Sequence, residues 1–287
     1  MPFGSPSCPF AFVRLRHFLL STVALLVLST TPAAAQTLPV FDAHVHYNLD
    51  EGRPLPVEEV LDLWRKAGIR GVLLNSRPNR GTRELLAAAG TEFRAVAFAR
   101  PYEVLADVRG WFRDPAIYQM IEEELDRGIY RGIGEFHIFG RDADTDGFAR
   151  FVRLAARKKL WLHAHCDDYV IERIFALDPD ARVIWAHTGM SVPAARVDEL
   201  FARQPRLYGE LSYRGGISDG DTLSAEWRAL FTRYPDRFLL GSDTWVPSRW
   251  PAVPDIMQGY RRWLAQLPPE VAHGIAWGNG ARLFFGE

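Results

Sequence analysis

The sequence predicts an α/β protein built as a single (β/α)8 TIM-like barrel. Short apolar segments alternate with amphipathic segments eight times along the chain, as in a parallel sheet whose strands are joined by helices. Residues 36–287 number 252 of the 287 in the chain, close to the roughly 250 residues typical of one such barrel. No stretch within them is long and polar enough to separate two domains. We therefore expect one barrel domain over residues 36–287.

Residues 1–35 differ from the rest of the chain and are predicted to be a signal peptide. Arg14 and Arg16 precede an apolar run over residues 18–28, which is short for a membrane span, and small residues at 33–35 form a cleavage site. An uncleaved anchor is the alternative. Export to the periplasm or to the medium is the expectation that follows.

The first four strands are predicted from short apolar runs. In residues 39–47 successive side chains would point to opposite faces of a strand, and residues 71–76 are continuously apolar. Residues 93–100 are followed by a proline, and residues 131–139 follow a glycine turn. Apolar residues at helical spacing follow each of them, from residue 57 to 64, over 82–89, within the long connection 104–128, and from 148 to the Lys-Lys end at 158–159.

The same rhythm continues to the end of the chain. Strands are predicted at 160–166, 183–187, 207–213 and 238–244, with helices at 169–177, 192–204, 224–234 and 256–267. A glycine-rich loop at 214–221 follows the seventh strand. All eight strands then lie parallel, and their carboxyl ends meet at one rim.

Composition excludes several classes of function. Without Arg14 and Arg16 the chain has 32 basic and 35 acidic residues, which gives the exported protein a net charge of −3. No cluster of basic residues suggests binding to nucleic acid. Cys8 leaves with the signal peptide and Cys166 stands alone, which excludes an intrachain disulfide and fits a buried apolar side chain. After cleavage no membrane association is expected, and a homodimer is expected on frequency alone.

Histidines and carboxylates gather where the predicted strands end. With His17 in the signal peptide, seven histidines remain, and six of them stand at strand ends. The strand-end residues are His44, His46, Glu135, His137, His163, His165, His187, Glu210 and Asp243. His44 and His46 share one face of a strand, so both imidazoles can approach one divalent ion. Because barrel active sites lie at the carboxyl ends of the strands, we predict a catalytic metal centre there.

These motifs, in this order, resemble the strand ends of the amidohydrolase superfamily. The segments are Asp42-Ala43-His44-Val45-His46, Gly134-Glu135, Leu162-His163, Ala186-His187-Thr188-Gly189 and Gly241-Ser242-Asp243, and residues 278–284 are similar to the closing segment of its type 2 branch. The resemblance covers residues 40–284. It implies a metal-dependent hydrolase with one or two divalent ions, most commonly Zn²⁺.

Each residue has an expected role. His44, His46 and His163 supply nitrogen ligands, and Asp243 both ligates the metal and moves a proton between water and the leaving group. His187 is either a ligand of a second ion or the donor that polarises the substrate carbonyl. Glu135 resembles the bridging carboxylate of TatD-type deoxyribonucleases, with a second role as a salt-bridge partner left open. On this alignment His165 becomes a substrate contact, although the sequence leaves the strand-five ligand undecided between His163 and His165.

The mouth of the barrel is predicted to bind the substrate. His137, Arg100, Arg214 and Trp245 follow strands four, three, seven and eight, and either arginine could hold a carboxylate. A hydrogen-bonded wall residue is the alternative for His137, and a loop salt bridge is the alternative for each arginine.

The expected activity is hydrolysis of an ester, lactone or amide. A non-oxidative decarboxylase of the type 2 branch, using a carboxylate-binding arginine, is the first alternative. A TatD-like phosphodiesterase is disfavoured by the lack of a basic groove, and a metal- or solute-binding barrel without catalysis is the non-enzymatic alternative. The substrate itself is not predicted.

Overall fold

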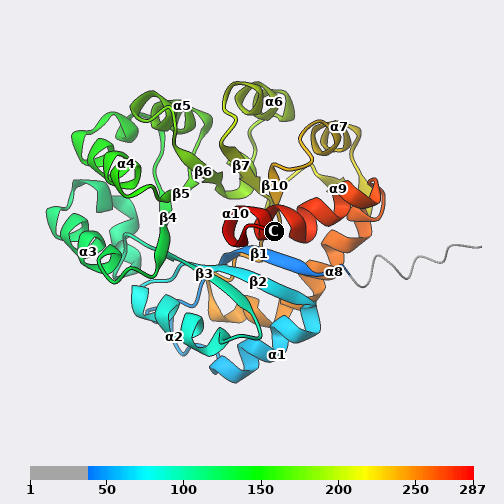
Figure 1. Cartoon of the computed structure of the whole chain (residues 1–287), viewed down its shortest axis with the longest axis horizontal. Coiled ribbons are helices and arrows are strands. Elements are labelled where there is room, and N and C mark those ends of the chain that lie inside the picture. The colour runs from blue at the N-terminus through cyan, green and yellow to red at the C-terminus, as the bar shows by residue number, and fades with distance from the viewer. Residues whose placement is uncertain (1–37) are drawn as a thin grey trace, which may run out of the picture. The chain divides into compact units, whose positions relative to one another are not determined.

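A computed structural model of the chain describes residues 38–287 and confirms the predicted barrel (Figure 1). Its strands, in chain and in spatial order, are β1 (Val40–Val45), β2 (Ile69–Leu74), β3 (Arg94–Ala99), β4 (Tyr130–His137), β5 (Trp161–His165), β6 (Arg182–Trp185), β7 (Leu207–Glu210) and β10 (Phe238–Leu239). Neighbouring strands pair in parallel throughout. The predicted signal peptide lies outside the described residues.

Helices surround the sheet on its outer side. They are α1 (Val57–Ala67), α2 (Asn79–Ala89), α3 (Pro115–Leu125), α4 (Asp146–Lys158), α5 (Asp168–Leu177), α6 (Ala194–Arg203), α7 (Ala225–Arg233), α8 (Val253–Leu264), α9 (Pro269–His273) and α10 (Asn279–Phe285). In α1 the buried residues recur at helical spacing, and the helix ends where Gly68 adopts a left-handed conformation with φ 70°. None of the helices formed by residues 38–287 has the length and hydropathy of a membrane span.

The barrel is closed between its first and last strands by polar contacts more than by a regular ladder. The Ala43 N–H donates to the Leu240 carbonyl at 2.8 Å, and the Asp243 N–H donates to the His44 carbonyl at 2.7 Å. The side chain of Asp42 accepts the Ser242 N–H at 2.8 Å. The predicted eighth strand, 238–244, is therefore regular only over β10, because a side chain takes up part of its backbone pairing.

Several other predicted boundaries differ from the structure; the seventh strand, for example, was expected to reach residue 213 but ends at Glu210. The sixth strand was expected to reach residue 187 but ends at Trp185, because His187 and Thr188 have φ values of 55° and 44° and the chain turns away. The predicted loop 214–221 contains part of a hairpin, β8 (Ser218–Asp219) paired antiparallel with β9 (Thr222–Leu223).

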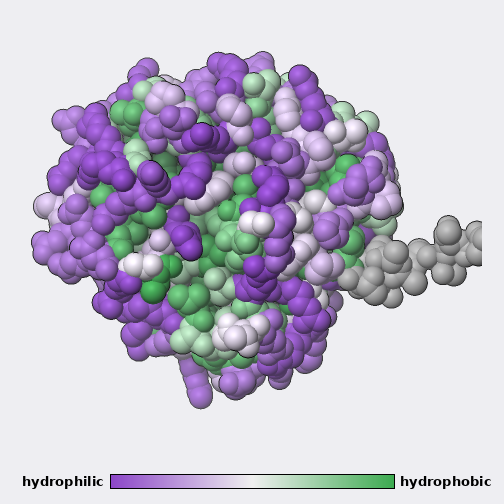
Figure 2. Space-filling view, in the orientation of Figure 1, coloured by the Kyte–Doolittle hydropathy of each residue, from purple (hydrophilic) through white to green (hydrophobic). Residues whose placement is uncertain are grey.

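The interior of the barrel is apolar at its amino end. Phe41, Phe98 and Trp161 pack in one cluster, and the Phe284 ring of α10 stacks on Phe41 and contacts the other two rings, with centroids 5.3–6.0 Å apart. This helix lies across the barrel in Figure 1. Figure 2 views the same face, where hydrophilic residues dominate and apolar residues gather toward the centre. The amino end is thus plugged by packing, which leaves the carboxyl end for chemistry.

Candidate metal centre

The carboxyl ends of the strands bring the predicted polar residues together. His44 lies on β1 and His46 directly follows it, Glu135 lies on β4, His165 ends β5, and Asp243 lies in the loop after β10. Glycine is required next to Glu135, because Gly134 has φ 130° and a Cβ there would lie 2.2 Å from the His163 carbonyl oxygen. The local backbone is therefore specific for this placement of the carboxylate.

Four ligand atoms converge on one point. The Nε2 atoms of His44 and His46 lie 3.0 Å apart. Oε2 of Glu135 lies 3.4 Å and 3.2 Å from these two nitrogens, and Oδ1 of Asp243 lies 3.6 Å and 3.2 Å from them. All four side chains are buried.

The hydrogen bonds of the other ring nitrogens indicate that the converging Nε2 atoms are acceptors. His44 Nδ1 donates to Glu210 at 2.9 Å. His46 Nδ1 lies 2.5 Å from the Asn75 carbonyl, the closer of its two contacts, and 3.0 Å from the Arg100 guanidinium, so we assign its proton to the bond with Asn75. In these tautomers both Nε2 atoms are acceptors, so two nitrogen lone pairs and two carboxylate oxygens face one another. Tetrahedral zinc with bonds of about 2.0–2.1 Å sets its ligand atoms about 3.3 Å apart, which matches the observed spacing. The donor set therefore fits a divalent metal.

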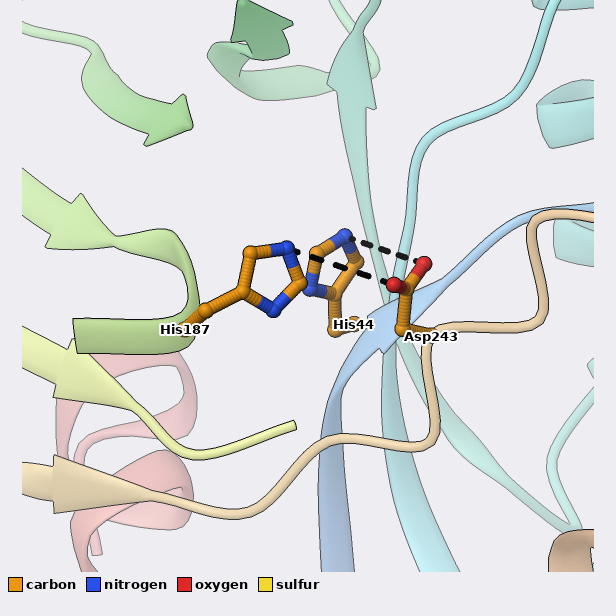
Figure 3. A group of neighbouring side chains, drawn as sticks. All are labelled: His44, His187 and Asp243. Atoms are coloured by element: carbon orange, nitrogen blue, oxygen red, sulfur yellow. Dashed lines mark ion pairs between the residues drawn. The ribbon is translucent and has the colours of Figure 1, made fainter. Parts of the chain in front are cut away.

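A second set of potential metal-ligand atoms surrounds the other oxygen of Glu135; this set and the first are called the two donor groups. Oε1 of Glu135 lies 3.0 Å from Nδ1 of His165 and 3.6 Å from Nε2 of His187. Oδ2 of Asp243 lies 4.0 Å from the same His187 nitrogen. Figure 3 shows His44 and His187 approaching the Asp243 carboxylate from two different strand ends. Glu135 thus contacts both groups, one through each oxygen.

Glu210, which ends β7, is hydrogen-bonded to His44, one of the four residues of the first group. Its carboxylate accepts hydrogen bonds from His44 Nδ1, from the His187 and Ser212 N–H groups, and from the Ser212 hydroxyl. Burial opposes its charge, but the neighbouring His44 outweighs burial and lowers the pKa of Glu210 to about 2. An ionised carboxylate at Nδ1 fixes the imidazole so that Nε2 is free to ligate.

Asn75 fixes the remaining parts of the centre. Its carbonyl accepts the His46 Nδ1–H, and its side-chain oxygen accepts the Glu135 N–H at 2.9 Å. The Thr244 hydroxyl bonds both the N–H and the carbonyl of His46, at 3.0 Å and 2.8 Å. Asn75 therefore joins His46 to the Glu135 backbone, and Thr244 joins His46 to the loop after β10.

The charges of the metal-free centre favour a cation at His44. Burial disfavours a charged imidazole, yet the carboxylates of Asp243, Glu135 and Glu210 outweigh it and raise the pKa of His44 well above its usual value. For Glu135 and Asp243, burial raises the pKa, but the nearby histidines prevail and hold both pKa values below their usual range. The positive charge that these carboxylates attract is a proton when no metal is bound.

The two histidines of β5 occupy different depths of the barrel. The sequence alignment favoured His163 as the strand-five ligand, but the structure places His165 beside Glu135 and His187. His163 lies one layer deeper, with its ring 4.6 Å from that of His44, and neither of its nitrogens has a hydrogen-bond partner among the described residues. Burial lowers the pKa of His163 well below its usual value, so this imidazole is neutral. One of its nitrogens still lies within 4.8 Å of ligand atoms of His44 and Glu210.

Both arginines predicted to bind substrate are engaged elsewhere. Arg100 is buried, and its guanidinium donates to the carboxylate of Glu135 at 2.9 Å and to the Glu135 carbonyl at 3.2 Å. Arg214 donates to the carbonyls of Met190 and Val192 and stacks over Trp227. Arg100 thus forms a salt bridge with a candidate ligand, and Arg214 holds the loop after β6 through backbone carbonyls rather than through the salt bridge given as its alternative.

A cavity of about 420 Å³ opens above the two donor groups. Its inner wall contains Glu135, His165, His187 and Asp243, and its outer wall contains Trp245 and other apolar residues. His137 also lines it, with its ring 4.3 Å from that of His165, and burial lowers the pKa of His137 to about 3. The predicted places of His137, His165 and Trp245 at the mouth are therefore confirmed, whereas their roles stay predictions.

Sequence reasoning gave no role to two residues of the centre. Glu210 was noted at a strand end without a role, and Asn75 was assigned none. The signal for Glu210 was present, because a carboxylate ends a buried strand there just as Glu135 does. The contribution of Asn75 comes largely from its backbone carbonyl, which carries no sequence signal.

Comparisons with known proteins agree with this architecture. Residues 33–286 match the profile of the family described as Amidohydrolase. An amidohydrolase from Burkholderia multivorans, solved with bound zinc, is 16% identical with a TM-score of 0.56, covering 85% of this chain and 98% of its own. Amidohydrolase 2 from Bifidobacterium longum subsp. infantis is 16% identical with a TM-score of 0.51, covering 86% and 98%. A dihydroorotase is 14% identical with a TM-score of 0.57, covering 87% and 73%. No curated protein sequence matches the chain.

Proposed function

Because the chain belongs to the amidohydrolase family, we propose that it is a metal-dependent hydrolase that cleaves an ester, lactone or amide bond of a small organic substrate. The observation that carries this proposal is the convergence of four acceptor atoms, from His44, His46, Glu135 and Asp243, at the floor of an open cavity. Arg100 donates to one of these atoms, Oε2 of Glu135, whereas a purely structural cluster would supply donors to the others as well.

The proposed centre holds two divalent ions, most simply Zn²⁺. His44, His46 and Asp243 would hold one ion and His165 and His187 a second, and the two oxygens of Glu135 face one group each. A bound ion of this kind supplies Lewis acidity, which acidifies water and polarises a carbonyl oxygen. Arg100 donates to Glu135 and so offsets part of the negative charge of the ligand set.

Asp243 is the proposed proton carrier. Its two oxygens face different donor groups, at 3.2 Å from His46 Nε2 and 4.0 Å from His187 Nε2, and its carboxylate also lines the cavity. With its pKa held below the usual range, it is ionised at neutral pH. It can therefore accept a proton from the attacking water and deliver that proton to the oxygen or nitrogen of the leaving group. Water adds to the carbonyl carbon, the bond to the leaving group breaks, and an acid and an alcohol or amine are released.

The test is a hydrolysis assay on the zinc-reconstituted protein. A panel of neutral aryl esters, lactones and amides should include substrates that turn over, and Asp243→Asn should lose the activity while remaining folded. Release of CO₂ from an aromatic or enol acid, with no ester or amide cleaved, would favour the decarboxylase alternative. Stoichiometric metal without turnover of any substrate would leave the non-enzymatic binding barrel.

We also propose that the protein is exported. The basic, apolar and small-residue pattern of residues 1–35 supports this, and Edman sequencing of the protein recovered from its producing cell should begin at Gln36. Recovery of an intact N-terminus in the membrane fraction would favour the uncleaved anchor.

A further inference from the structure

The outer part of the cavity above the metal centre is apolar. Leu105, Val108, Met190, Tyr213 and Trp245 line it, and they come from the connections after β3, β6, β7 and β10. These residues share one cavity with Glu135, His165, His187 and Asp243. A substrate group bound among them would therefore be continuous with the reacting carbonyl.

Exposed apolar side chains are concentrated around the same mouth. Among residues 38–287, seven large apolar side chains are exposed, and six of them lie on loops that follow barrel strands at the carboxyl end: Val104, Leu105, Phe139, Met190, Tyr213 and Trp245. The seventh, Ile129, immediately precedes β4 and so lies toward the opposite end. Apolar exposure gathered in this way indicates a binding surface, whereas scattered single residues would not.

The two arginines of the cavity are not free to pair with a substrate anion. Arg77 donates to the carboxylates of Asp50 and Glu51, and its side chain is almost wholly buried. Arg100 donates to Glu135, which the proposed ions also use. A carboxylate on the substrate would have to displace one of these pairs, because both guanidinium groups already have carboxylate partners.

The rim is also held in place. The Trp245 indole N–H donates to the Tyr213 hydroxyl at 3.2 Å, and the Arg249 guanidinium lies 4.0 Å from the centre of the Tyr213 ring. Asn48 donates to the Trp245 carbonyl at 2.8 Å. These contacts hold an aromatic wall whose shape is formed before substrate arrives, and a cavity of about 420 Å³ falls within the roughly 300–1,000 Å³ of small-molecule sites.

We propose that the substrate is uncharged away from its scissile bond and carries an alkyl or aryl group that occupies this apolar wall. The inference rests on the proposed hydrolase function and adds a substrate class to it: neutral apolar esters or lactones are preferred over those bearing a second carboxylate. Leu105, Met190 and Trp245 are the specificity-determining residues.

The kinetic test compares p-nitrophenyl acetate, butyrate and hexanoate with the p-nitrophenyl monoester of succinate, which matches the butyrate in chain length but adds a charge. We expect kcat/KM to rise about fourfold per methylene and to fall at least tenfold for the succinate. Trp245→Ala should lower kcat/KM for the hexanoate about tenfold and leave the acetate within about twofold. Ile129→Ala, which removes the exposed apolar residue at the other end, is the matched control.

A binding test does not depend on turnover. Isothermal titration of the zinc-loaded protein with acetohydroxamic, butyrohydroxamic and hexanohydroxamic acids should give Kd values that fall along the series, and the monohydroxamate of succinic acid should bind more weakly than butyrohydroxamic acid. Met190→Lys, which adds a free cation to the wall, should reverse that last order.

The outcomes separate the two proposals. The expected hydroxamate series without hydrolysis of any ester or lactone would contradict the proposed function and uphold the apolar wall. Hydrolysis with no dependence on chain length, or with preference for the succinate monoester, would overturn the apolar substrate class and leave the hydrolase. Absence of hydroxamate binding, or equal Kd values along the series, would also overturn it.

Discussion

Replacing Glu210 by Gln should weaken metal binding even though Glu210 is not a proposed ligand. The carboxylate is fully buried, and each group that contacts it is a donor: His44 Nδ1 at 2.9 Å, the His187 N–H at 3.1 Å, and the N–H and hydroxyl of Ser212. Glutamine keeps the shape but turns one acceptor oxygen into an NH₂ donor. That NH₂ would meet other donors.

The expected loss follows from the hydrogen bond to His44. If the amide NH₂ faces Nδ1, the imidazole must carry its proton on Nε2, which removes the lone pair aimed at the metal. Partners of this kind behind a histidine ligand are worth about 10- to 100-fold in metal affinity. Because all the groups around Glu210 are donors, the upper part of that range is expected, about 2–2.7 kcal/mol at 25 °C.

The assay is a zinc titration in competition with a chromophoric chelator, on wild type, Glu210→Gln and Glu59→Gln. Glu59 is an exposed residue of α1, so its variant controls for the loss of one charge. Circular dichroism of the metal-free proteins checks that each is folded. A folded Glu210→Gln variant whose zinc Kd stays within about threefold of wild type would refute the role assigned to Glu210.

Three further results are expected. Asp243→Asn should lower kcat for ester hydrolysis by about 10²- to 10⁴-fold, as loss of a general acid–base group does, and a loss below tenfold would assign proton transfer elsewhere. Zinc affinity should rise with pH, because the raised pKa of His44 means that a proton must leave before the metal binds; a profile flat from about pH 5.5 to 7.5 would contradict this. Burial raises the pKa of Asp42 from 3.8 to about 7, so the folded metal-free protein holds a proton that the unfolded chain has lost, and stability should fall between about pH 4 and 7. In urea titrations, the Asp42→Asn variant should lack up to about 4 kcal/mol of the pH-dependent decrease in the free energy of unfolding. A variant with the same pH dependence as the wild type would show that Asp42 is ionised in the folded protein.

The barrel and the gathering of ligands at one rim could be predicted from the sequence for a simple reason. Parallel strands joined by helices all end at the same edge, so the residue that follows each apolar run lies at that edge. His44, His46, Glu135, His187 and Asp243 all lie at this rim in the structure, because each stands within a few residues of the carboxyl end of a strand.

Depth within the barrel could not be predicted in the same way. His163 and His165 share a face of β5, and sequence alternation gives that face without saying which residue reaches the level of Glu135. The level depends on the register between β4 and β5, which shifts between Gly134 and Phe136, so that His165 pairs with His137. Such an irregularity follows from tertiary packing and leaves no periodic signal.

The partners of charged side chains were also beyond the sequence. Arg100 follows β3 at the mouth, where a substrate-binding arginine would stand, but its length lets it reach Glu135 across the neighbouring strand. Arg214 turns toward the carbonyls of the loop after β6, whose positive φ angles the sequence does not reveal. The position of an arginine on a loop therefore predicted its neighbourhood and not its contact.

The most direct test of the account is the zinc content of the purified, reconstituted protein beside its Glu135→Gln variant, measured by inductively coupled plasma mass spectrometry. The two donor groups on Glu135 predict about two equivalents of zinc in the wild type and at most one in the variant, which keeps one oxygen acceptor but loses the charge that both groups share. One equivalent in both proteins would contradict the bridging role of Glu135. No stoichiometric zinc in the wild type would contradict the metal centre itself.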